Sequence, residues 1–93
     1  MFLVGESVEL DIELGSYSVE SGLRLVWQMG FELRVRAAAG EVVLSGNEAG
    51  LRSLAQHLLT LSQEHVPTGV HAHMEPGLEL EDDSTALVIE KYH

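Results

Sequence analysis

The chain has 93 residues, with 15 acidic and 5 basic side chains, no cysteine and a formal net charge of −10. This length fits a single domain, residues 1–93. The lack of cysteine excludes disulfides, thiolate zinc sites and cysteine nucleophiles. The acidic balance argues against nucleic acid and anionic membrane as partners, because both are recognised by clustered Lys and Arg.

The N-terminal stretch has no basic region of the kind that opens a secretory signal. The longest run without a charged residue, 53–63, is far shorter than the ~20 apolar residues of a membrane span. We therefore expect a soluble, cytoplasmic protein.

Alternating apolar and polar residues predict strands in the N-terminal half. Residues 8–14 alternate cleanly, which is typical of a strand with one polar face, and a Ser- and Gly-rich loop follows. Residues 23–28 and 31–36 are predicted to form a hairpin around Met29-Gly30. The polar face of the first strand carries Glu9, Asp11 and Glu13. If that strand pairs with the second or third, these acids face Arg24, Arg34 and Arg36.

A second turn at 37–40 precedes a returning strand at 41–45. The period then changes, and 47–64 is predicted to be an amphipathic helix. Asn47 or Ser45 can supply the N-cap oxygen, while Gly50 weakens the first turn by up to about 1 kcal/mol. The apolar stripe comprises Leu51, Leu54, Ala55, Leu58 and Leu61. We expect Leu51, Leu54, Leu58 and Leu61 to pack against Leu25, Trp27, Leu33 and Val88.

After Pro67 the sequence predicts a strand at 69–75, a loop with a short strand at 78–80, and a last strand at 85–92. The last strand is apolar on both faces in its middle, which is typical of a position inside a sheet. The predicted fold is α+β: an antiparallel sheet of five to six strands with one helix on one face, in the order ββββαββ.

His71 and His73 stand at i and i+2 of a predicted strand, so both imidazoles share one face, with Glu75 two residues further on. Such a set can ligate zinc or iron if a second element contributes. The alternative is an ordinary solvent-exposed face. The cupin motif also contains HxH, but it needs Gly where this chain has His65, and Glu79 comes one residue too late. We expect no metal or other cofactor and no catalytic residues.

Three segments together resemble the immunity protein 32 family of bacterial polymorphic-toxin systems. They are "GLRSLAQHLLTLSQ" on the predicted helix, "VPTGVHAHMEPG" after it and "STALVIEK" near the end. The resemblance covers roughly residues 41 to 91. It implies a small α+β protein that neutralises a cognate toxin by direct binding and is not an enzyme.

The acidic residues indicate where a basic partner, such as a toxin domain, could bind. The predicted contact surface consists of His71, His73, Glu75, Glu79, Glu81, Asp82 and Asp83, because residues 75–83 contain no Lys or Arg. The row Glu9, Asp11 and Glu13 is the weaker candidate. Two other hypotheses remain open. One is a metal-binding protein or enzyme that uses His71, His73 and Glu75; the other is a homodimeric structural or regulatory subunit joined at a sheet edge.

Overall fold

The computed structural model describes residues 7–93, and its elements follow the predicted order ββββαββ. The strands are β1 (Ser16–Ser18), β2 (Gly22–Arg24), β3 (Leu33–Ala38), β4 (Glu41–Gly46), β5 (His71–Met74) and β6 (Leu87–Glu90), and the helix is α1 (Glu48–Ser62). The predicted α+β class is therefore confirmed. Within the described residues, no helix is long and apolar enough to cross a membrane.

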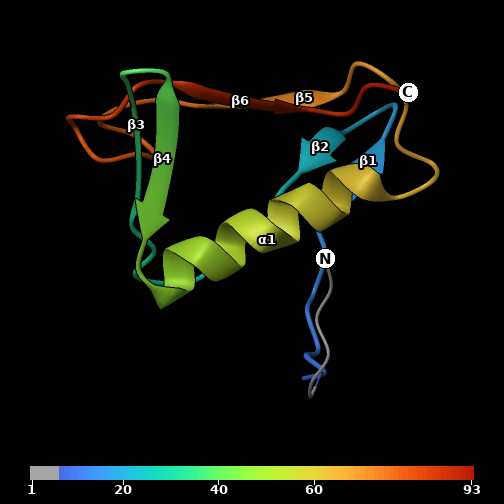
Figure 1. Cartoon of the computed structure of the whole chain (residues 1–93). Coiled ribbons are helices and arrows are strands. Elements are labelled where there is room, and N and C mark those ends of the chain that lie inside the picture. The colour runs from blue at the N-terminus through green and yellow to red at the C-terminus, as the bar shows by residue number, and fades with distance from the viewer. Residues whose placement is uncertain (1–6) are drawn as a thin grey trace.

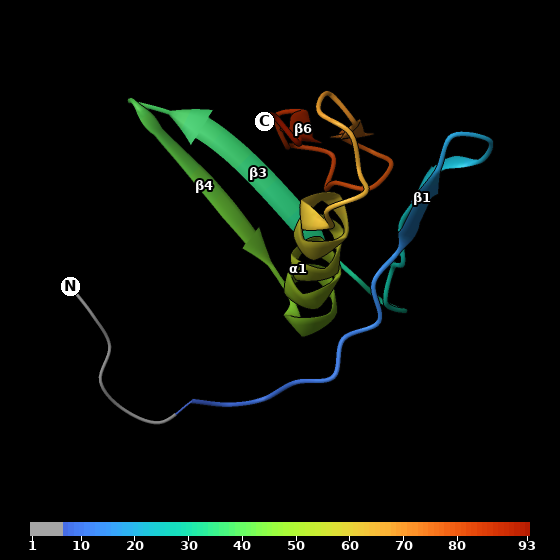
Figure 2. The ribbon, with the colours of Figure 1, turned by 90° about the vertical axis from the view of Figure 1, so that its right-hand side faces the viewer.

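The strands form three separate antiparallel pairs, β1–β2, β3–β4 and β5–β6. These hairpins lie around α1 (Figure 1). Figure 2 looks nearly along the helix, with β3–β4 on one side of it, β6 above and β1 on the other side. The prediction of one sheet of five to six strands is therefore wrong. The outer edge of β3, for example, is bonded by residues 81–85 of a loop and not by another strand.

The β3–β4 hairpin is the longest strand pair. β4 lies where it was predicted, whereas β3 begins and ends two residues later than predicted. Its two-residue turn is Ala39-Gly40, and both residues have positive φ angles, 52° and 80°. A turn of this type matches the twist of the strands that it joins, and Gly40 adopts the conformation without steric cost. Leu33 and Val35 face the core from β3.

The second edge of β3 is occupied by loop residues. The N–H groups of Glu81 and Thr85 donate to the carbonyl oxygens of Leu33 and Val35, at 2.8 and 2.7 Å. The hydroxyl of Ser84 accepts the N–H of Val35 at 3.1 Å. The loop after β5 is thus fixed against the core hairpin rather than free in solvent.

The N-terminal strands are displaced from their predicted positions. Residues 8–14 form no strand, and the predicted loop at 15–22 contains β1 and part of β2. The predicted strand 23–28 is a strand only as far as Arg24, although the turn at Met29-Gly30 is present. Apolar and polar residues alternate at 8–14 with the two-residue period of a strand, but no strand within the described residues pairs with this segment.

Polar side chains of α1 take the hydrogen bonds that strand partners would have supplied. Thr60 Oγ1 accepts the N–H of Gly15 at 2.8 Å, and Ser53 Oγ accepts the N–H of Gln28 at 2.8 Å. Gln56 Nε2 donates to the carbonyl of Glu13, also at 2.8 Å. Irregular segments before and after the first hairpin therefore pack directly against the helix.

These contacts rotate the buried face of α1 away from the predicted stripe. Leu54 and Leu61 are buried, but Leu51 and Leu58 are 47% and 49% exposed. The buried face instead includes Ser53, Gln56, His57 and Thr60. The predicted packing of Leu51 and Leu58 is therefore wrong. Three polar residues with distant hydrogen-bond partners and the ring of His57 take their place.

The helix ends are held by residues from other elements. Asn47 Oδ1 accepts the N–H groups of Gly50 and Glu32, at 2.8 and 2.9 Å, so the predicted N-cap also binds the segment before β3. Lys91 Nζ donates to the carbonyl of Gln63 at 2.8 Å, where the negative end of the helix dipole favours a cation.

The apolar core is small and lies between β3, α1 and the C-terminal residues. It comprises Leu33, Val35, Leu54, Met74 and Leu80, with Trp27, Leu87 and Ile89 packed against it. Val88, a predicted core residue, is half exposed because β6 belongs to a two-stranded hairpin with one outer face. Residues 78–80 form no strand; only an isolated bridge joins Pro76 and Leu80.

Candidate partner-binding surface

His71 and His73 lie on the outer face of β5, and both are exposed, as predicted. Ala72 and Met74 alternate with them and face inward, which follows from the two-residue period of a strand. The two imidazole rings meet edge to face, with centroids 5.0 Å apart. Glu90 of β6 stands opposite His71 in the strand register, so it lies beside this histidine pair.

The histidine pair is not completed into a ligand set. His71 Nδ1 is 2.8 Å from the carbonyl oxygen of Gly69, so this ring nitrogen is engaged with the preceding turn. Residues 7–93 contain no group of three His, Cys, Asp or Glu side chains that could hold a metal ion. Glu75 in particular is not brought together with His71 and His73.

Glu75 and Glu79 shape the tight turn that follows β5. The N–H of Glu75 donates to Glu79 Oε1 at 3.0 Å. The carbonyl of Glu75 accepts the N–H groups of Leu78 and Leu80, each at 3.1 Å. Gly77 has φ +81°, and its N–H donates to the carbonyl of Leu80 at 2.8 Å. One of the predicted contact carboxylates, Glu79, is therefore already used inside the loop.

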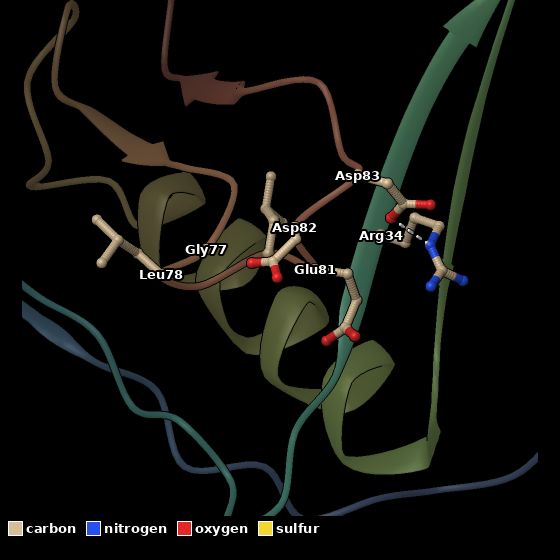
Figure 3. Close-up of a pocket in the computed structure, with 7 residues that line it drawn as sticks. Arg34, Gly77, Leu78, Glu81, Asp82 and Asp83 are labelled. Atoms are coloured by element: carbon tan, nitrogen blue, oxygen red, sulfur yellow. Dashed lines mark hydrogen bonds and ion pairs between the residues drawn. The ribbon is translucent and has the colours of Figure 1, made fainter.

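Asp83 is paired with two arginines of β3. Its Oδ1 lies 2.9 Å from Arg34 Nε (Figure 3). Its Oδ2 lies 3.1 Å from a guanidinium nitrogen of Arg36. The hydrogen bond from Arg34 holds the pKa of Asp83 below its usual value, and the same bond raises the pKa of Arg34. The sequence would place these arginines opposite Glu9, Asp11 and Glu13 only if residues 8–14 formed a paired strand, and they form none.

Glu81 and Asp82 are the carboxylates of this loop that remain available. Both are exposed, and neither forms an ion pair within the part of the chain that the structure describes. They line an open depression of about 440 Å³ (Figure 3). Its other lining residues are Arg34, Gly77, Leu78, Leu80 and Asp83. The depression is therefore acidic on one side and bordered by the paired arginine on the other.

The second acidic row borders an apolar cavity of about 580 Å³ between residues 10–13 and α1. Apolar walls come from Leu10, Ile12, Val26, Leu51 and Ala55. Glu9, Asp11 and Glu13 are exposed and, within residues 7–93, form no ion pair. This row is therefore more available to a partner than the sequence indicated.

His57 is a buried titratable group on α1. It is fully buried, and neither ring nitrogen has a hydrogen-bond partner among the described residues. Its ring packs edge-on against Trp27, with centroids 4.2 Å apart. Burial lowers the pKa of His57 to about 4. The sequence did contain a signal, because His57 lies three residues after Leu54 and four before Leu61, on their helix face.

The family model of immunity protein 32 matches residues 41–92, which is more than half of the chain. The chain belongs to the immunity protein 32 family. The match begins at the first residue of β4 and takes in α1, β5 and β6. The family region thus contains the capping Asn47, the exposed histidine pair and the acidic loop, whereas β1 to β3 precede it. No curated protein and no solved structure matches this chain.

Proposed function

We propose that this member of the immunity protein 32 family neutralises a cognate bacterial toxin in the cytoplasm by binding it directly, without catalysing a reaction. The family match carries the proposal. The net charge of −10 supports a basic toxin domain as the partner, because opposite charges accelerate encounter. The same charge opposes binding to nucleic acid or to an anionic membrane.

We further propose that the toxin contacts the histidine pair and the acidic loop, which comprise His71, His73, Glu75, Glu79, Glu81, Asp82 and Asp83. Two of these residues have a structural role within the molecule: Glu79 in the loop turn and Asp83 beside the arginines. Glu81 and Asp82 keep exposed carboxylates, so they are the strongest candidates for ion pairs with a partner. The hydrogen bonds between this loop and β3 would present the two carboxylates in a fixed arrangement.

The test is a titration of the cognate toxin domain with this protein, followed by toxin activity and by complex formation on a sizing column. We expect inhibition to be complete at about equimolar protein and to be reversed when the complex is dissociated. Inhibition by far less than one equivalent, or toxin that stays inactive after separation, would point to an enzymatic mechanism instead. Absence of a complex would contradict the proposal.

A further inference from the structure

Strand β4 has one edge paired with β3 and one edge without a partner in residues 7–93. The N–H of Asn47 donates to the carbonyl of Glu32 at 3.2 Å, so these residues form a hydrogen-bonded pair at the base of the hairpin. Such pairs alternate along an antiparallel ladder. The backbone groups of Val42, Leu44 and Gly46 therefore point away from β3, toward the free edge.

This edge lacks the features that normally prevent a strand from pairing further. All six residues of β4 are exposed, and its centre is apolar, with Val42 70% and Val43 54% exposed. The strand contains no proline, lysine or arginine, and its register with β3 has no bulge. Edge strands that stay unpaired usually carry at least one of these devices. An additional strand is therefore expected to occupy the edge.

The charge of the β3–β4 hairpin indicates which molecule can pair with the free edge of β4. The β3–β4 hairpin carries Arg34, Arg36 and one carboxylate, Glu41, and Asp83 pairs with both arginines, so this region is close to neutral although the whole chain has a net charge of −10. The hairpin consequently offers little attraction to the basic toxin that we propose as partner. It is instead the part of the surface where two copies of this acidic chain can approach with the least repulsion.

We propose that β4 is a homodimer interface, in which it pairs antiparallel with β4 of a second copy about a two-fold axis at Val43. Val42 and Leu44 of each copy then exchange backbone hydrogen bonds with Leu44 and Val42 of the other. The register places Val43 against Val43 and Glu41 against Ser45, so apolar residues face each other and no like charges are opposed. Such an interface uses the same residues in both copies.

This interface is separate from the proposed toxin surface. The acidic loop bonds to the edge of β3 that lies opposite β4, through Glu81 and Thr85. A dimer formed through β4 therefore leaves Glu81 and Asp82 accessible in both copies. The inference does not depend on the proposed function, and it can be tested with the purified protein alone.

The first test is sedimentation equilibrium of the full chain. We expect a monomer–dimer equilibrium that shifts toward dimer when salt is raised from about 0.05 M to about 0.5 M, because salt screens the repulsion between two acidic chains. A monomer at both salt concentrations and at high protein concentration would overturn the proposal. So would a dimer that dissociates as salt rises, since ion pairs would then hold it together.

The second test uses Val43→Lys, with Val19→Lys as the matched control. Val19 is exposed in the turn between β1 and β2, so both variants add one positive charge at an exposed valine. Only Val43→Lys places two cations across the axis, and we expect it to weaken the dimer by about tenfold or more. Val19→Lys should leave the dimer intact. Equal effects of the two variants would overturn the proposal, and circular dichroism checks that both fold.

The third test exploits the absence of cysteine from the chain. Residues that face each other in a non-hydrogen-bonded pair have Cα atoms about 4.5 Å apart, which is within the range that a disulfide spans. Val43→Cys should therefore form a covalent dimer under mild oxidation, much faster than Val19→Cys. Crosslinking of Val43→Cys that is no faster than that of Val19→Cys would show that β4 does not meet β4.

Discussion

The carbonyl oxygen of Glu32 lies directly over Gly50 in the first turn of α1, only 2.0 Å from where a β-carbon on Gly50 would stand. The same segment is bound by Asn47, whose Oδ1 accepts the N–H of Glu32 at 2.9 Å. The helix and the start of β3 are therefore in backbone contact. A glycine that is unfavourable for the isolated helix is required by this contact.

We predict that Gly50→Ala destabilises the protein by about 1–3 kcal/mol, the usual cost of overpacking, even though alanine is the better helix former. Urea unfolding at equilibrium measures the change in the free energy of unfolding. The control is Ala55→Gly on the exposed side of α1, which should cost roughly 0.5–1 kcal/mol from propensity alone. A stabilised Gly50→Ala variant would show that Glu32 does not pack against the helix.

The local features of this fold could be predicted because each depends on neighbouring residues. The cap at Asn47, the turn at Ala39-Gly40 and the alternation in β5 are examples. The buried face of α1 could not be predicted in this way. Ser53 and Thr60 bind backbone groups 25 and 45 residues away in the sequence, and these partners make burial of polar side chains favourable.

Leu54 and Leu58 provide a direct test of the helix orientation. Leu54 is 7% exposed, so Leu54→Ala should cost about 2–5 kcal/mol as a buried truncation. Leu58 is half exposed, and Leu58→Ala should cost less than about 1 kcal/mol. Urea unfolding of the two variants gives the comparison. If Leu58→Ala were the more damaging change, the apolar stripe read from the sequence would be the true buried face.

The stability of the fold should depend on pH through His57. The folded imidazole has a pKa of about 4, below its ordinary value of 6.5, because burial disfavours the charged ring. The unfolded chain therefore takes up a proton at a higher pH than the folded chain does. The stability that depends on a neutral His57 is fully present above pH 6.5, and it is lost as the pH falls toward 4. Over that window the loss amounts to about 3 kcal/mol.

The variant His57→Phe separates this effect from the titration of carboxylates. Phenylalanine keeps a ring against Trp27 and leaves no buried nitrogen without a partner, so stability at pH 7 should be retained or increased. Urea unfolding at pH 7 and pH 5 should show a smaller loss than in the wild type. The exposed His65, changed to Gln, is the control and should leave the pH dependence unchanged. If His57→Phe lost as much stability between pH 7 and pH 5 as the wild type, His57 would not be the source of the pH dependence.

Metal removal should not affect the folded protein. His71 and His73 are exposed, and one nitrogen of His71 already faces the Gly69 carbonyl, so we expect these side chains to hold no ion that the fold needs. We expect a chelator to leave the melting temperature of untagged protein unchanged. A chelator-dependent decrease that is absent from the double variant His71→Ala, His73→Ala would restore the metal-site hypothesis.

The sequence indicated which side chains could form the candidate surface, but it did not indicate which of their charges are paired within the fold. The exposure of His71 and His73 follows from strand alternation, which the sequence displays. The sequence places no basic residue within the acidic loop, but in space Arg34 reaches Asp83 across 49 positions. Glu9, Asp11 and Glu13 would face arginines only from a paired strand at 8–14, which the structure does not contain. Long-range pairing therefore uses the carboxylate of Asp83 but leaves those of Glu81 and Asp82 exposed, like those of the N-terminal row.

The toxin should accordingly distinguish between these two surfaces when equal charge is removed from each. Glu81→Gln with Asp82→Asn neutralises the unpaired carboxylates of the loop, and Glu9→Gln with Asp11→Asn removes the same charge from the N-terminal row. Rim charges act mainly on the association rate. We expect the loop variant to slow association more than the row variant at low salt. The difference should disappear at high salt, where exposed charges are screened.

Association kinetics by surface plasmon resonance at two salt concentrations measure this difference. Both double variants should fold as well as the wild type or slightly better, because each lowers the self-repulsion of a chain with net charge −10. A larger effect of the row variant would move the toxin contact to residues 9–13 and their apolar cavity. Equal slowing would mean that only overall charge matters, since steering by net charge does not depend on where the carboxylates lie.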